Sequence, residues 1–249
     1  MRLYFSRPHC HTLKPSNIMK GIMFNENYGL ETAVITGCKT LTRRRIPFTG
    51  NDLKFLRKEP DFPKKYAPYV IGHYARYRVG DIVAVRQSYQ TIYNWMRLHG
   101  ANEPQLIDYE LTHRNAPGWS NKMFVLNEEM PYVVKIEAVR VERTRDITDE
   151  DALREGVHRV LFDLDDIQSV IYYVPGIKPI GKRQPTYEHY GQKVIAFSTP
   201  REAFRALICR TVSPKAWADN DWQFVYTLRY RPSDNEYFRS YHPFTIEHP

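Results

Sequence analysis

The sequence predicts an α+β fold with mostly antiparallel strands, and three observations lead to this prediction. The predicted elements run helix, strand, strand, strand, short helix, helix, strand, so they lack the alternation of βαβ units. The longest alternating apolar stretch, YVVKIEAVRVE at 132–142, is typical of a strand with one buried face. The chain contains no glycine-rich phosphate loop and no nucleophile elbow, which argues against the common nucleotide-binding and α/β-hydrolase classes.

The composition fits one globular domain over residues 1–249, with 42% hydrophobic and 26% charged residues. The 36 Lys and Arg residues exceed the 28 Asp and Glu residues and give a net charge of +8. This excess favours polyanionic partners, although many proteins that bind no nucleic acid share it. The 18 tyrosines can stack on bases or fill a β-rich core.

The cysteines and the apolar runs predict a cytoplasmic protein without metal, cofactor or membrane contact. Cys10, Cys38 and Cys209 have no paired spacing, which argues against a zinc ribbon or a disulfide framework and fits a reducing compartment. The cluster of His9, Cys10 and His11 could bind a metal, but structural zinc sites usually take four ligands. Residues 1–20 lack the apolar run of a secretory signal, and no stretch reaches the roughly 20 apolar residues of a membrane span.

Residues 25–46 are predicted to form a helix, a sharp corner and a basic strand. Leu30, Val34 and Ile35 have helical spacing, and Gly37 suits the left-handed conformation at a helix end. The following KTLTRRRI alternates long and β-branched residues and predicts a strand. The corner between them carries three consecutive arginines, and an inward-facing arginine must meet an anion or lose its hydration at a high cost.

The remaining elements follow in order along the chain. Further strands are predicted at 82–89, 123–125, 132–142 and 222–230, and the third has a bulge near Ala138, where the alternation changes phase. Helices are predicted at 148–155, which Thr148 caps and Gly156 ends, and at 199–211, which begins with a Thr-Pro pair.

The other segments are predicted to lie outside this framework. They are a lead-in at 1–20, insertions at about 47–79, 90–120 and 157–197, and a tail at 231–249. The first insertion is basic and rich in tyrosine, and it is predicted to be irregular.

Four motifs in this order resemble the ASCH domain, a PUA-like family, and in particular its long members from phages and prophages. GCKTLTRRRI resembles the family's G-x-K-T-x-T-R-R stretch, and GDIVAVRQSY resembles its G-D-x-x-x-V-R-E-x-W strand. YVVKIEAVRVERTRDITDEDALREGV resembles its long strand followed by D-I-x-x-E-D-A-x-x-E-G, and FRALICRTVSPKAWADNDWQFVYTLRY resembles its final helix, W-D-A-N-P-W piece and closing strand. The chain departs from this pattern at Gln87, Tyr89 and Asp221, where glutamate, tryptophan and proline are usual.

The resemblance implies a PUA-like, mostly antiparallel β-barrel with helices at its rim and a cleft over the basic strand. It implies that the protein binds RNA or a modified nucleoside. Some smaller members are amidohydrolases that deacylate N(4)-acetylcytidine, and the positions here that match their lysine, threonine and glutamate are Lys39, Thr42 and Glu155. Three hypotheses follow: a binding module, an amidohydrolase, and a phage protein that binds a host protein through its insertions.

Amide hydrolysis needs a nucleophile, a base and stabilisation of the oxyanion. Thr42 could supply the hydroxyl, Lys39 could act as base if nearby arginines lower its pKa, and Glu155 could carry a proton or hold water. Each also has an ordinary structural explanation: a cation beyond a helix end, a good strand residue and a solvated carboxylate. Residues three apart on a strand face opposite sides, so Lys39 and Thr42 converge only if Lys39 still lies in the corner or the strand is bulged.

Nucleic-acid contacts are assigned to Arg43, Arg44, Arg45, Arg86 and Tyr89. Arg43 and Arg45 fall on one face of the predicted strand and Arg44 on the other. Whichever face looks into the cleft could clamp a phosphate or stack on a base. The alternative is that these arginines form salt bridges with carboxylates such as Glu137 or Glu142.

Overall fold

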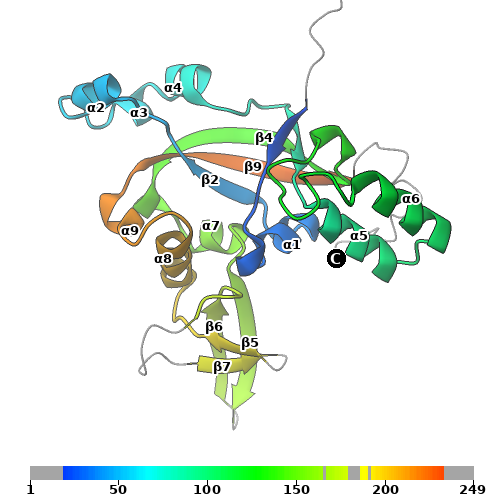
Figure 1. Ribbon diagram of the computed structural model, residues 1–249. Coiled ribbons are helices and arrows are strands. Elements are labelled where there is room, and N and C mark those ends of the chain that lie inside the picture. Colours follow the sequence, from blue (N-terminus) through cyan, green and yellow to red (C-terminus); the bar gives the residue numbers. More distant parts are fainter. Residues whose placement is uncertain (1–18, 165–166, 179–185, 190–191, 233–249) are drawn as a thin grey trace, which may run out of the picture.

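A five-stranded sheet is the centre of the computed structural model, which describes residues 19–164, 167–178, 186–189 and 192–232 (Figure 1). In spatial order its strands are β1 (Lys20–Ile22), β3 (Ile82–Val85), β4 (Tyr132–Arg143), β9 (Trp222–Pro232) and β2 (Leu41–Arg45). Only β1 and β3 pair in parallel, while the other neighbours in this sheet are antiparallel. The predicted α+β class with a mostly antiparallel sheet is therefore confirmed.

The long central pair β4 and β9 carries the middle of the sheet. Val134 and Ile136 of β4 are fully buried, as the alternation of their stretch predicts. The register between β4 and β9 shifts between Ile136 and Ala138, which confirms the predicted bulge.

The sheet does not close into a barrel, so this part of the prediction is wrong. Its two edges are β1 and β2, and the structure contains no ladder between them in the residues it describes. The chain just after β1 nevertheless approaches β2, because Nη2 of Arg44 donates a hydrogen bond to the carbonyl oxygen of Met23 at 2.8 Å. Both edge strands are short, and β2 carries three consecutive arginines, features that discourage further strand pairing.

Short helices cover one end of the sheet, and their caps follow the sequence signals. These are η1 (Glu26–Tyr28), α1 (Leu30–Ile35), α7 (Asp149–Arg154), α8 (Pro200–Thr211), α9 (Ala216–Asp219) and the turn η3 (Thr144–Asp146). The hydroxyl of Thr148 accepts a hydrogen bond from the backbone of Asp151, as predicted. Gly37 and Gly156 take left-handed conformations after α1 and α7, with φ of 76° and 99°.

The first insertion is helical, not irregular as predicted. It forms α2 (Gly50–Leu56), α3 (Phe62–Lys65) and α4 (Ala67–Tyr74), which make an arm beside the sheet (Figure 1). Thr49 and Asp52 form a reciprocal capping box that starts α2, and Pro63 and Pro68 lie in the first turns of the next two helices. These helix-start signals are present in the sequence, but the prediction of an irregular segment relied on composition and overlooked them.

The other two insertions also have regular structure, and their described residues add no strand to the central sheet. They form α5 (Tyr89–Leu98), α6 (Glu103–His113) and the hairpins β5 (His158–Leu164) with β6 (Ile167–Tyr173) and β7 (Thr186–His189) with β8 (Gln192–Ile195).

The strand predicted at 82–89 ends early, because Ser88 caps α5 and Tyr89 is its first residue. The strand predicted at 123–125 is not formed, and the turn η2 (Asn127–Glu129) follows instead. Most of the predicted lead-in and tail lies outside the described residues.

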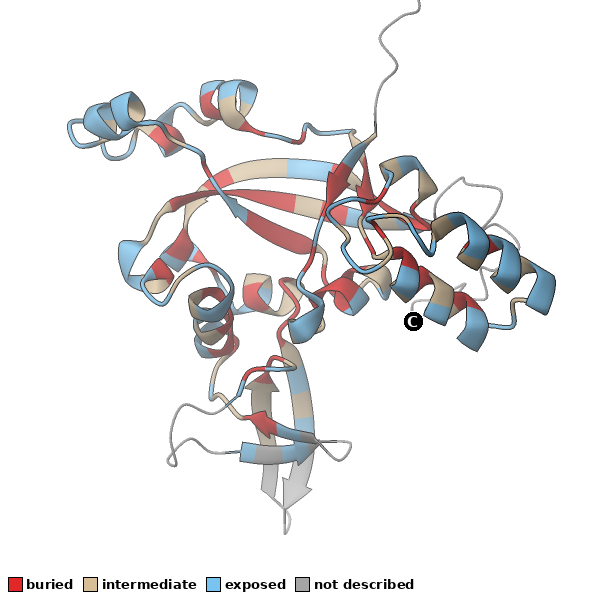
Figure 2. Ribbon diagram, viewed as in Figure 1, coloured by how far each residue is buried: buried red, intermediate tan, exposed pale blue. Residues whose placement is uncertain are grey.

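The buried apolar side chains of the described residues form two hydrophobic clusters. Figure 2 shows buried residues along the central strands and on one side of helices such as α5 and α8. The larger one packs the sheet against α1, α7 and α8 and includes Ile136, Phe204 and Tyr226. The smaller one lies under α5 and α6 and includes Ile92 and Met96. Within the described ranges, no helix combines the length and apolar character that crossing a membrane requires.

Candidate functional site

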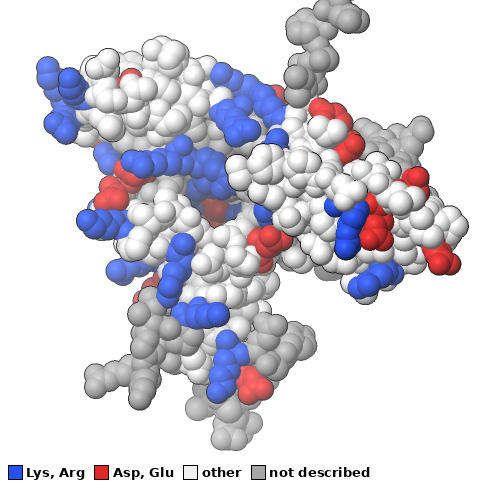
Figure 3. Space-filling view, viewed as in Figure 1, with Lys and Arg blue, Asp and Glu red and all other residues white. Residues whose placement is uncertain are grey.

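A cavity of about 510 Å³ lies along β2, where the two sheet edges approach each other. Its wall combines the segment after β1, the corner before β2, the end of α7 and one face of α8. The lining residues that matter below are Phe24, Lys39, Thr42, Arg43, Arg44, Arg45, Lys122, Glu155, Phe204 and Gln223. Figure 3 shows Lys and Arg side chains gathered in the hollow between the α2–α4 arm and helices α8 and α9.

The corner that precedes β2 brings Lys39 into this cavity. The strand begins at Leu41, so Lys39 still belongs to the turn, and its backbone N–H donates to the carbonyl of Ala33 at 2.7 Å. The spacing of three that would separate Lys39 from Thr42 on a regular strand therefore does not apply. Lys39, Thr42 and Glu155 line the same cavity.

Lys39 and Glu155 form a buried ion pair. The Nζ atom of Lys39 lies 2.5 Å from Oε2 of Glu155 and also donates to its backbone carbonyl at 2.7 Å. Burial lowers the pKa of Lys39 and is the largest influence on it, while the carboxylate of Glu155 acts in the opposite direction. Arg44 and Arg43 lower this pKa least, so the arginines are not the main cause that the sequence suggested.

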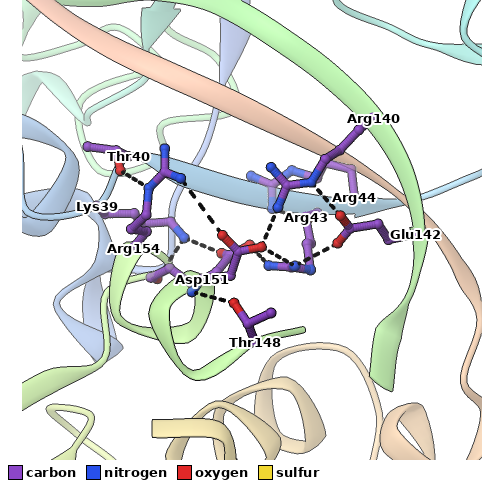
Figure 4. A network of polar contacts seen from close by, with 10 residues as sticks. Lys39, Thr40, Arg43, Arg44, Arg140, Glu142, Thr148, Asp151 and Arg154 are labelled. Atoms are coloured by element: carbon purple, nitrogen blue, oxygen red, sulfur yellow. Dashed lines mark hydrogen bonds and ion pairs between the residues drawn. The ribbon is translucent and has the colours of Figure 1, made fainter. Parts of the chain in front are cut away.

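Arg43 is held by carboxylates and is not free for a ligand phosphate. Its guanidinium contacts Glu155 and Glu142 at 3.0 Å and Asp151 at 3.3 Å, and only 7% of the residue is exposed. Arg140 joins the same network through Glu142 and Asp151 (Figure 4). The alternative of an arginine paired with Glu142 is thus the one found for Arg43.

Arg44 differs from the other cations that line the cavity. Lys39, Arg43, Arg45 and Lys122 each have a carboxylate within ion-pair distance. Arg44 has none among the residues that the structure describes; it donates to backbone carbonyls and lies 5.6 Å from the ring centre of Phe24. Its guanidinium is therefore the cation of this wall whose charge is least neutralised.

Thr42 presents a hydroxyl at the cavity wall. The residue is 1% exposed overall and lines the cavity together with Lys39 and Glu155. A hydroxyl beside a lysine and a carboxylate has the composition of a nucleophilic site. In this conformation, however, Lys39 directs its Nζ atom to the carboxylate of Glu155, an interaction that favours the charged ammonium and opposes the effect of burial on its pKa.

Arg86 and Tyr89 are not among the residues that line the cavity. Nε of Arg86 donates to Oδ1 of Asn127 at 2.6 Å. Tyr89 is 3% exposed, and its hydroxyl donates to Glu129, so its ring is part of the second hydrophobic cluster. Burial raises the pKa of Tyr89 to about 12, and the bond to Glu129 adds to this rise.

The contacts that two polar side chains make with buried Glu31 near the cavity were missed from the sequence. Lys122 donates to Oε2 of Glu31 at 2.8 Å and to the carbonyl of Phe24 at 2.7 Å. Gln87 donates to Oε1 of Glu31 at 3.0 Å, so a carboxylate from α1 lies beside this side chain. These partners are far apart in sequence. Glu31 resembles an ordinary exposed acidic residue of a helix, so no local pattern predicts its burial.

No group of three or more His, Cys, Asp or Glu side chains in the described ranges is arranged to hold a metal ion. The His9–His11 cluster lies outside these ranges. Comparisons of the chain with known protein families, curated proteins and solved structures find no match. The site is therefore characterised by its own geometry.

Proposed function

We propose that the cavity binds a nucleoside unit of RNA or a free modified nucleoside. The observation that carries the proposal is the position of Arg44, a cation without a carboxylate partner among the described residues, beside the ring of Phe24 in the cavity wall. An arginine of this kind can pair with a phosphate, and an aromatic ring offers a face to a base.

The size and chemistry of the wall suit such a ligand. A volume of about 510 Å³ falls within the roughly 300–1,000 Å³ of small-molecule sites. Phe24, Phe204, Leu207 and Ile208 supply apolar surface for a flat ring. The lining cations outnumber the lining carboxylates, five against three, which favours an anionic group on the ligand.

Equilibrium binding of short single-stranded RNA and of nucleoside monophosphates tests the proposal. Affinity should fall with salt, because phosphate contacts release counterions. Arg44→Ala should weaken binding and lower the salt slope by about 0.7 for each phosphate that the variant no longer neutralises. Arg229→Ala is the matched control, because Arg229 lies on β9, pairs with Glu137 and does not line the cavity. Equal affinity of both variants and the wild type would reject the proposal.

A second candidate function is hydrolysis of an acylated nucleoside, which the shared cavity of Lys39, Thr42 and Glu155 favours. In this reaction the Thr42 hydroxyl attacks the amide carbonyl carbon and passes its proton to a base, and the C–N bond breaks as the amine leaves with a proton. Water then hydrolyses the acyl-Thr42 ester, which releases acetate and restores the hydroxyl. Lys39 would have to give up a proton first, and its lowered pKa makes this easier than for an exposed lysine. Acetate release from N(4)-acetylcytidine measures the activity, and Thr42→Val should abolish it while binding persists.

A protein partner is the third candidate, and exposed apolar side chains on the second insertion favour it. Leu98, Ile107 and Leu111 are 76%, 50% and 78% exposed, and Met123 and Phe124 are about as exposed. Leu98→Ser with Leu111→Ser should then remove binding of that partner and leave nucleoside binding unchanged.

A further inference from the structure

Two buried polar atoms in the cavity wall have no hydrogen-bond partner among the described residues. They are Nε of Arg43, a donor, and Oε1 of Gln223, an acceptor. Both residues line the cavity, and they are 7% and 5% exposed. Buried polar groups nearly always have partners, so two such atoms in one wall indicate a ligand or an ordered water.

The strand register places the two side chains together. Gln223 of β9 lies opposite Arg45 of β2, and Arg43 lies opposite Val225, two positions further along β9. Directly paired residues share a face and diagonal neighbours on that face lie within reach of long side chains, so Arg43 and Gln223 project from the same side of the sheet.

The direction of the Arg43 donor is fixed by its other contacts. Both terminal nitrogens form hydrogen bonds, with Glu142, Asp151 and Glu155 as acceptors, whereas Nε is the nitrogen of the guanidinium that has no partner among the described residues. A phosphate is a poor ligand here, because three carboxylates already neutralise the guanidinium and the oxygen of Gln223 would repel an anion. A neutral group that offers one acceptor beside one N–H is complementary to this pair of atoms.

We propose that Nε of Arg43 and Oε1 of Gln223 recognise the hydrogen-bonding edge of a nucleobase, where a ring acceptor stands beside an amino group. This inference rests on the proposed nucleoside function and identifies the part of the ligand that Arg43 and Gln223 recognise. Cytosine fits through its ring N3 and its amino N–H, and Arg44 contacts the phosphate separately. Gln223 is then a specificity-determining residue.

Two cytidine analogues of nearly the same shape test the inference. Pyrimidin-2-one riboside lacks the amino group, and 3-deazacytidine lacks the ring acceptor. Wild-type protein should bind each about tenfold or more weakly than cytidine, because sites built for a hydrogen bond reject ligands that lack it. Gln223→Met should bring the preference over pyrimidin-2-one riboside close to one, whereas Gln223→Glu keeps an acceptor and should retain it.

The controls separate this inference from the proposed function. Gln90→Met, at an exposed position of α5, should leave the preference unchanged, and a thermal melt shows that Gln223→Met is folded. Equal affinity of the wild type for cytidine and both analogues would overturn the inference alone. A buried water would then satisfy Nε of Arg43 and Oε1 of Gln223. An unchanged preference in folded Gln223→Met would overturn it as well. No binding of any nucleoside would overturn the proposed function and the inference together.

Discussion

The Nζ atom of Lys39 lies 2.5 Å from Oε2 of Glu155, although the two residues are 116 positions apart in sequence. They are 3% and 4% exposed. The pair joins the corner before β2 to the C-terminal end of α7, where Glu155 is the cap residue. It therefore connects two walls of the cavity, and its charges belong to the site as well as to the fold.

Removing the carboxylate of this pair should destabilise the protein strongly. Glu155→Gln leaves Lys39 buried without its partner and deprives Arg43 of one of its carboxylates, so we expect a loss of about 3–5 kcal/mol in the free energy of unfolding. Lys39→Met should cost less, because Arg43 still neutralises Glu155. Urea denaturation of both variants and of the double variant measures the coupling. Equal costs for both single variants would contradict this ranking.

The glycine after Glu155 should resist substitution. Gly156 has φ of 99°, where a side chain is strained, and an added Cβ would lie 3.1 Å from Leu30. We expect Gly156→Ala to lower the free energy of unfolding by about 1–2 kcal/mol. Gly72→Ala is the control, because Gly72 lies inside α4 with no atom within 4 Å of an added Cβ. That variant should be stabilised by about 0.5–1 kcal/mol, since alanine favours a helix. A larger loss at Gly72 than at Gly156 would contradict the prediction.

Tyr89 should make stability depend on alkaline pH. Its pKa is raised to about 12 in the folded protein, whereas an unfolded tyrosine titrates near pH 10. The unfolded state therefore loses this proton first, and the stabilising contribution is complete below about pH 10 and is lost as the pH rises towards 12. The stability difference between wild type and Tyr89→Phe should shrink between about pH 10 and about pH 12 in thermal melts. A constant difference would show that Tyr89 does not titrate as proposed.

The local features of the fold could be predicted from the sequence. Periodicity and caps identified the corner at Gly37, the bulged strand β4, and helices α7 and α8. The closure of the sheet could not be predicted, because it depends on whether short edge strands meet across space. The hairpins β5–β6 and β7–β8 were missed because residues 157–197 were predicted as one insertion outside the framework, although parts of this stretch are rich in apolar residues.

The candidate site was only partly accessible to sequence reasoning. Lys39, Thr42 and Glu155 were named together through a resemblance, and no local pattern links residues so far apart. The roles of the arginines depend on contacts across the fold: Arg43 meets three carboxylates, whereas Arg44 meets none among the described residues. Tyr89 shows the converse, since an aromatic residue that suits a base is used in a core.

Photo-crosslinking tests the central claim, that the cavity is where RNA binds, most directly. Short single-stranded RNA that contains 4-thiouridine is irradiated with the full-length protein, and the crosslinked peptides are mapped by mass spectrometry. If RNA binds in the cavity, crosslinks should map to the segments that contain Phe24 and Thr42–Arg44, and both competing cytidine monophosphate and Arg44→Ala should diminish them. Crosslinks confined to the α2–α4 arm or to α5 and α6, unaffected by either treatment, would contradict it.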